Sequence, residues 1–300
     1  MSVRLAGYLR NSALVTLTVA LSGPVVAQEH TPANGYVPDK VAAPAPQFPP
    51  RRAGAAFADC SDCPEMVVLA PGSFVMGSSE RERRTLGVMA MFDTMEQPRH
   101  GVTIDYALAV GRYEVTFAQW DACVADGGCN GYRPDDAGWG RGRRPVINVN
   151  YADAKAYVDW LSAHTGERYR LLSEAEWAYA ARGGTQTWYP FGNAIGAQDA
   201  NFGRNLSGTS TVGAYAPNRF GLHDMIGNVA EWVEDCHHDD FVGAPSDGSA
   251  WLDGECTLRN VRGGAWSLDG WSVRAAQRIG DPPGARNDHL GFRVARELVR

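Results

Sequence analysis

The chain has 300 residues, with 28 lysines and arginines against 34 aspartates and glutamates, which gives a formal net charge of −6. This length accommodates one large domain or two ordinary ones, and no internal repeat is visible. Basic clusters such as Arg141-Gly-Arg-Arg144 are short and lie in a glycine-rich stretch. The composition therefore argues against binding to nucleic acid or to an anionic membrane surface.

Residues 1–27 have the features of a secretory signal peptide. Arg4 and Arg10 form a basic start, residues 12–24 are mostly apolar, and small residues precede a cleavage point after Ala27. Ser22-Gly-Pro24 interrupts the apolar run, which favours cleavage over the alternative of an uncleaved membrane anchor. The sequence thus predicts a secreted protein with no membrane span after cleavage, and the bacterial periplasm as its location.

Residues 28–56 are predicted to be a proline-rich linker, because repeated prolines remove the hydrogen-bond donors that helices and sheets need. Six prolines occur in this stretch: Pro32, Pro38, Pro44, Pro46, Pro49 and Pro50. A folded domain is expected over residues 57–300.

Six cysteines follow the leader, and an even number in an exported chain indicates disulfides. Their spacing suggests three local pairs, although fifteen pairings are possible: Cys60 with Cys63, Cys123 with Cys129, and Cys236 with Cys256. The third pair closes the longest loop and should stabilise by about 3 kcal/mol. A redox-active Cys60–Cys63 pair would precede a helix, and a zinc site would need a second ligand pair; neither pattern is present.

Short strands are expected to dominate the first third of the domain. Residues 66–69 and 73–76, separated by Ala70-Pro-Gly72, are typical of a β-hairpin. A charged loop should follow as far as Pro98, and further strands are expected at residues 102–104 and 107–110.

Three helices are predicted from capping signals that begin at Thr116, Asn150 and Ser173. Glycines end them near residues 127, 166 and 183. The chain beyond the third helix is rich in glycine, asparagine and proline, and little regular structure is expected there. Helices set in an irregular β framework predict an α+β single domain.

Several motifs occur in a fixed order along the domain: Val75-Met-Gly77, Arg112-Tyr-Glu-Val-Thr116, Arg144-Pro-Val-Ile-Asn-Val149, Ser173-Glu-Ala-Glu-Trp177, Gly227-Asn-Val229 and Gly291-Phe-Arg293. Together they resemble the formylglycine-generating enzyme (sulfatase-modifying factor) family, from about Cys60 to Arg296. The resemblance implies a compact fold related to C-type lectins, low in regular secondary structure and stabilised by bound calcium.

The family's calcium ligands map onto Asp224, Gly227, Val229 and Glu231. Carboxylate and carbonyl oxygens suit this hard cation, and glycine allows the bend that turns a carbonyl inward. The alternative is that Asp224 and Glu231 cap turns without any metal. A further family site would begin at Asn201-Phe202, but the loop that should complete it contains no carboxylate.

Copper is not expected, because the two cysteines that hold Cu(I) in the family's enzymes correspond to Leu268 and Val273 here. Neither side chain can donate an electron pair to a soft cation. The family's histidine and serine in this region are replaced by Asp269 and Ala265. The resemblance therefore implies a member without copper-dependent formylglycine-generating activity.

Catalytic residues are not identified by any motif, and Asp269, Trp271 and Arg274 are the candidates for a groove beside Trp266. The metal-like run His237-His-Asp-Asp240 is better explained as a solvated loop behind Cys236, because adjacent side chains of an extended segment point to opposite faces.

Two functions are compatible with these observations. The first is an exported accessory or binding protein for a peptide or small-molecule ligand. The alternative is a periplasmic oxidoreductase of the same fold that uses non-thiolate chemistry, since the resemblance includes a periplasmic branch that matures siderophore chromophores without the cysteine pair.

Overall fold

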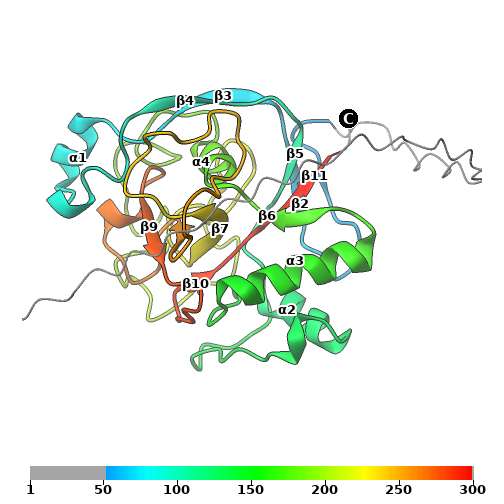
Figure 1. The fold of residues 1–300 in the computed structure, drawn as a ribbon. Helices are drawn as coiled ribbons and strands as arrows, with labels where there is room; N and C mark the ends of the chain where they lie inside the picture. The colour runs from blue at the N-terminus through cyan, green and yellow to red at the C-terminus, as the bar shows by residue number, and fades with distance from the viewer. Residues whose placement is uncertain (1–51, 299–300) are drawn as a thin grey trace, which may run out of the picture. The chain divides into compact units, whose positions relative to one another are not determined.

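The computed structural model describes residues 52–298, so the predicted leader and residues 28–51 of the predicted linker lie outside the described part. The described residues form four α-helices: α1 (Glu80–Leu86), α2 (Phe117–Ala125), α3 (Tyr151–Thr165) and α4 (Glu174–Arg182). Three 3₁₀ turns add to them: η1 (Ala90–Phe92), η2 (Cys129–Gly131) and η3 (Gly270–Val273). Figure 1 shows α3 running beside β6 and close to α2.

A five-stranded antiparallel sheet joins both ends of the described chain, in the order β1-β2-β5-β11-β6. Its strands are β1 (Ala56–Phe57), β2 (Met66–Leu69), β5 (Leu108–Gly111), β6 (Tyr169–Leu171) and β11 (Val294–Glu297). The last strand lies between β5 and β6, so the sheet is complete only when the end of the domain has been added.

A four-stranded sheet has the order β10-β7-β8-β9. Its strands are β7 (Ala230–Cys236), β8 (Arg259–Arg262), β9 (Arg278–Asp281) and β10 (Leu290–Gly291). β10 runs parallel to β7, whereas the other pairs are antiparallel. The sequence predicted little regular structure here, because glycine-rich connections hide strands of two to seven residues.

The predicted hairpin over residues 66–76 is wrong, although both of its strands exist. β2 pairs with β1 and β5, while β3 (Gly72–Met76) pairs with β4 (His100–Ile104) in a separate two-stranded sheet. Both edges of β2 are already occupied, so β3 must find another partner. A turn signal shows that the chain changes direction but does not identify the strand that it meets.

The three predicted helices are confirmed, and each begins with a capping box as expected. α3 ends at Gly166, whose φ of 73° is a left-handed conformation that glycine adopts without strain. α1 lies in the stretch predicted as a charged loop. Ser79 caps it by accepting a hydrogen bond from the Glu82 amide at 3.1 Å, and its apolar content is too low to reveal it by periodicity.

All six cysteines form the three local disulfides that the spacing suggested. Beyond these bonds, two apolar clusters make up the core, and their largest fully buried side chains include Trp120, Trp177 and Trp232. The α+β, single-domain prediction is confirmed over residues 52–298. In that range, the structure has no helix with the length and apolar character needed to cross a bilayer.

Candidate functional site

The motifs that stand apart in the sequence meet around the buried carboxylate of Glu231 on β7. Trp177 from α4 donates its indole N–H to Oε2 at 2.7 Å, and the Arg293 guanidinium donates to Oε1 at 2.6 Å. The side chains of Glu231 and Arg293 are each only 1% exposed. A charge buried to this extent needs a paired partner, and Arg293 supplies it.

Asp224 lies beside this pair in a left-handed backbone conformation, with φ 53°. Its Oδ2 accepts a hydrogen bond from the Gly213 amide at 2.6 Å. Burial raises the pKa of Asp224 to about 6; the Gly213 amide and Arg293 oppose this shift, and Glu231 adds to it. The carboxyl group is therefore close to half protonated in mildly acidic solution.

Gly227 and Val229 complete the predicted calcium loop. Gly227 has φ 76°, and a side chain there would overlap the Asn201 carbonyl, so glycine is required on both counts. Glu231, however, already accepts from Arg293 and Trp177 through both oxygens. Within residues 52–298, no three acidic, histidine or cysteine side chains converge as a metal ligand set. The described geometry thus satisfies Glu231 without calcium, and calcium here stays a prediction.

The copper positions of the family contain no thiolate. Leu268 is 39% exposed and Val273 is fully buried. Every cysteine of the chain is in a disulfide, so none is available to replace them.

Of the three catalytic candidates, two are in contact, since Arg274 Nε donates a hydrogen bond to the Trp271 backbone carbonyl at 2.7 Å. The Arg274 guanidinium is fully buried and donates to Glu82 at 2.8 Å and to Glu96 at 2.6 Å, so it ties α1 to the core. Trp271 packs against Phe92 with ring centroids 5.6 Å apart, and Asp269 is exposed at the start of η3. None of the three lines the cavity of about 570 Å³ found within residues 52–298.

The predicted solvated loop at residues 237–240 also shows no metal-like geometry. His237 hydrogen-bonds Asn260 at 2.6 Å, and His238 stacks on Trp251 with ring centroids 3.5 Å apart. Both imidazole rings are thus engaged by neighbouring side chains of the protein.

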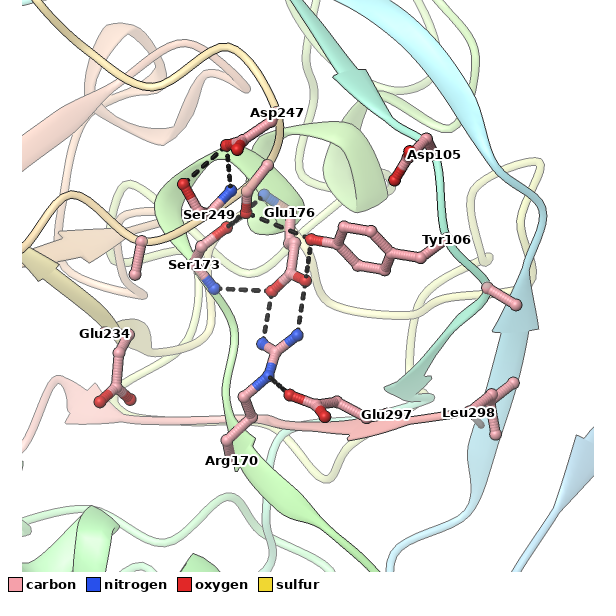
Figure 2. Close-up of a pocket in the computed structure, with 13 residues that line it drawn as sticks. Asp105, Tyr106, Arg170, Ser173, Glu176, Glu234, Asp247, Ser249, Glu297 and Leu298 are labelled. Atoms are coloured by element: carbon pink, nitrogen blue, oxygen red, sulfur yellow. Dashed lines mark hydrogen bonds and ion pairs between the residues drawn. The ribbon is translucent and has the colours of Figure 1, made fainter. Parts of the chain in front are cut away.

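A cavity of about 570 Å³ opens where six separate segments meet (Figure 2). It is lined by Asp105, Tyr106, Ala107, Arg170, Ser173, Glu176, Glu234, Asp247, Gly248, Ser249, Ala250, Glu297 and Leu298. These residues come from the approach to β5, from β6, the start of α4, β7, the loop before β8, and the end of β11. The sequence alone does not reveal this site, because no local pattern links positions so far apart.

Glu176 is fully buried and fixes the polar floor of this cavity. Its carboxylate accepts from the Ser173 amide at 2.8 Å, from Arg170 at 2.6 and 2.7 Å, and from the Tyr106 hydroxyl at 2.7 Å. Burial raises the pKa of Tyr106, and the Glu176 charge raises it further. Tyr106 therefore stays a neutral phenol, and Figure 2 shows its hydroxyl and Arg170 converging on Glu176.

The cavity lining is acidic: five carboxylates face one guanidinium, that of Arg170. Arg170 also reaches Glu297 at 3.2 Å, and Lys155 from outside the lining pairs with Glu234 at 2.8 Å. The Ser249 hydroxyl and amide hydrogen-bond Asp247 and lower its pKa, which keeps that exposed carboxylate ionised. This charge balance favours a basic group over an acidic one.

Residues 52–298 match the sulfatase-modifying factor enzyme 1-like domain. The chain belongs to this family. The match spans every structural element described above, and the resemblance drawn from the ordered motifs is confirmed.

Several relatives of this sulfatase-modifying factor family member are matched over only part of their length. The chain is 37% identical over 162 residues to the serine/threonine-protein kinase pkn1 of Chlamydia pneumoniae, covering 53% of this chain and 25% of that protein. It is 32% identical over 169 residues to the inactive C-alpha-formylglycine-generating enzyme 2 of Bos taurus, covering half of each. The chain thus spans half or less of the length of these relatives.

A solved structure gives fuller coverage. The structure of PvdO from Pseudomonas aeruginosa is 40% identical, with a TM-score of 0.74, and the alignment covers 83% of this chain and all of that one.

Proposed function

We propose that this protein is an exported member of the formylglycine-generating enzyme family that binds a peptide or small ligand and does not generate formylglycine with copper. One observation carries this proposal: Leu268 and Val273 occupy the thiolate positions while all six cysteines are paired. Soft Cu(I) requires thiolate ligands, and disulfide sulfur does not provide them. The family fold is retained, and it contains a cavity that can hold a ligand.

The cavity beneath Tyr106 is the binding site that the geometry supports best. Its volume of about 570 Å³ is within the range of small-ligand pockets. The buried Glu176 network holds its floor in one arrangement, so little ordering is needed when a ligand enters. The excess of carboxylates supports a ligand that presents an amine or guanidinium, such as a peptide with a lysine side chain.

Calorimetry with two short peptides tests this assignment, one containing lysine and the other its uncharged counterpart norleucine. The lysine peptide should bind at least tenfold more tightly. Asp247→Asn should reduce that difference, whereas Asp253→Asn, in the same loop but outside the lining, should leave it unchanged. Equal binding of both peptides, or an equal effect of both substitutions, would contradict the site.

The alternative is a periplasmic oxidoreductase of the same fold, acting in siderophore or peptide maturation through non-thiolate chemistry. Supporting it are the 40% identity to PvdO over the whole of that chain and the family branch that matures siderophore chromophores without the cysteine pair. Metal analysis of protein purified from the periplasm separates the two functions. A stoichiometric transition metal would favour the oxidoreductase and would count against a pure binding protein.

A further inference from the structure

The cavity of about 570 Å³ beneath Tyr106, the larger cavity below, already uses its hydroxyl hydrogens within the protein. A smaller cavity of about 300 Å³, beside Tyr113, shares none of its lining residues. The hydroxyl groups of the larger cavity are those of Tyr106, Ser173 and Ser249, and each donates to a carboxylate or carbonyl oxygen, at 2.7, 2.7 and 2.6 Å respectively. Within residues 52–298, this lining therefore offers a ligand no free hydroxyl hydrogen.

Arg170, the basic residue of the lining, is committed in the same way. Its Nε donates to Glu297 at 3.2 Å, and its Nη1 donates to Glu176 at 2.6 Å and to the Leu171 carbonyl at 3.0 Å. Its Nη2 donates to the other oxygen of Glu176 at 2.7 Å (Figure 2). Four of the five N–H groups of the guanidinium are thus paired within the protein.

Acceptors, in contrast, remain in the lining. Asp247 is exposed, and its Oδ1 accepts both hydrogen bonds from Ser249, at 2.6 and 3.0 Å, so Oδ2 takes part in neither. The Tyr106 hydroxyl has given its hydrogen away and can meet a ligand only as an acceptor. The two oxygens of the half-buried Glu234 accept from Lys155 and can each accept again. A ligand must therefore supply the hydrogens.

Aromatic surface does not compensate for these missing donors. Among the described residues that line the larger cavity, Tyr106 is the one aromatic side chain. A methylated ammonium without N–H groups is typically held by several aromatic rings around it. Apolar lining comes instead from Ala107, Ala250 and Leu298, which suits the methylene stem of a long side chain.

We infer that the larger cavity selects its ligand by N–H donors and not by positive charge alone, with Tyr106 and Asp247 as acceptors. It takes the unmethylated ammonium of a lysine side chain and rejects the trimethylated form. This inference rests on the proposed binding function of the same cavity. An ammonium brings three donors and no acceptor, whereas a trimethylammonium carries the same charge and leaves the lining oxygens unpaired.

Calorimetry with three short peptides that differ at one position tests this selection in the purified protein. The position holds lysine, trimethyllysine or norleucine. The lysine peptide should bind about tenfold or more tightly than the trimethyllysine peptide, the equivalent of one hydrogen bond to a charged group, although both carry the same charge.

The pattern of affinities separates the selection from the binding function. Trimethyllysine and lysine peptides that bind equally, and both more tightly than the norleucine peptide, would overturn donor selection and leave the binding function standing. Equal binding of all three peptides, or no binding of any, would contradict the binding function and the selection with it.

Tyr106→Phe separates hydrogen bonding from size, because trimethylation also enlarges the ligand. Phenylalanine keeps the ring and removes the acceptor oxygen, and the buried Glu176 keeps its contacts with Arg170 and the Ser173 amide. The lysine peptide should lose about threefold or more in affinity and the trimethyllysine peptide should lose none, so the preference falls. An unchanged preference would show that size excludes the trimethyl group and would contradict donor selection.

Tyr132→Phe is the matched control. Tyr132 also donates one hydrogen bond to a backbone carbonyl, that of Asn148 at 3.0 Å, and lies outside the lining. Its replacement should change the affinity of neither peptide. An equal loss of lysine preference in both tyrosine variants would remove Tyr106 from the site and contradict its role as an acceptor.

Discussion

Glu231 is engaged by side chains from two different parts of the chain, and this bears directly on the calcium prediction. If calcium binds at Asp224, Gly227, Val229 and Glu231, a chelator should lower the melting temperature, because a ligand of the folded state stabilises it. Glu231→Gln should abolish that response. An unfolding curve unaffected by chelator, with no calcium found by metal analysis, would contradict the calcium prediction and leave Glu231 with the Arg293 ion pair and the Trp177 hydrogen bond.

Removing Glu231 should be costly whichever way that experiment turns out. Glu231→Ala leaves the Arg293 charge buried without its partner and the Trp177 N–H without an acceptor. Breaking a buried ion pair from one side typically costs about 3–5 kcal/mol. We expect a loss of that size by urea denaturation in chelator. A loss below about 1 kcal/mol would contradict the assigned structural role.

Asp224 should make stability depend on pH in the acidic range. Its pKa is raised to about 6 in the folded protein, so the folded state holds the proton more tightly than the unfolded chain. Its contribution to stability is therefore present below about pH 4 and is lost as the pH rises towards 6. In chelator, Asp224→Asn should reduce the fall in unfolding free energy between pH 4.5 and 7 by on the order of 1–2 kcal/mol.

Asparagine is a suitable replacement at position 224. It tolerates the left-handed backbone and can still accept a hydrogen bond from the Gly213 amide. The exposed Asp253→Asn variant serves as the control. Parallel pH profiles for wild type and Asp224→Asn would show that this carboxyl does not titrate as described.

The disulfides close loops of different length, so they should contribute differently to stability. Cys236–Cys256 closes a 20-residue loop that carries Asp247 and Ser249, part of the wall of the larger cavity. Replacing both cysteines by serine should cost about 3 kcal/mol in the chain-entropy description, and removing Cys60–Cys63, which spans three residues, about half as much. Thermal unfolding of the two double variants measures this order, and the reverse order would contradict it.

Three of the four helices of residues 52–298 could be predicted from the sequence, whereas the pairing of the strands could not. Thr116, Asn150 and Ser173 each cap a helix through contacts within four residues, so the signal is local. Strand pairing is not local, because β11 at the end of the domain lies between β5 and β6. β5 precedes β11 by nearly two hundred residues, and β6 precedes it by more than one hundred. For the same reason the hairpin at residues 66–76 was wrong although its strands were right.

At the scale of the whole molecule, the functional surfaces are assembled from distant segments. The ordered motifs identify the family. Three of their residues or neighbours, Trp177, Glu231 and Arg293, form a buried hydrogen-bonded cluster in the core and do not line the larger cavity. The larger cavity depends on Tyr106, Arg170 and Glu176, which are 70 residues apart at most and meet only after folding. Glu176 could be recognised in the sequence as a helix cap, yet nothing local shows that it also anchors Tyr106.

We propose that this family member does not form formylglycine with copper, and one assay tests that proposal. Purified protein supplied with Cu(I) is incubated with a sulfatase-type peptide, and mass spectrometry follows the conversion of the cysteine thiol to the aldehyde. With Leu268 and Val273 at the thiolate positions and every cysteine paired, the peptide should remain unconverted. Catalytic turnover of the peptide to formylglycine would contradict the account, and its loss on replacing one cysteine pair would locate the active site at that disulfide.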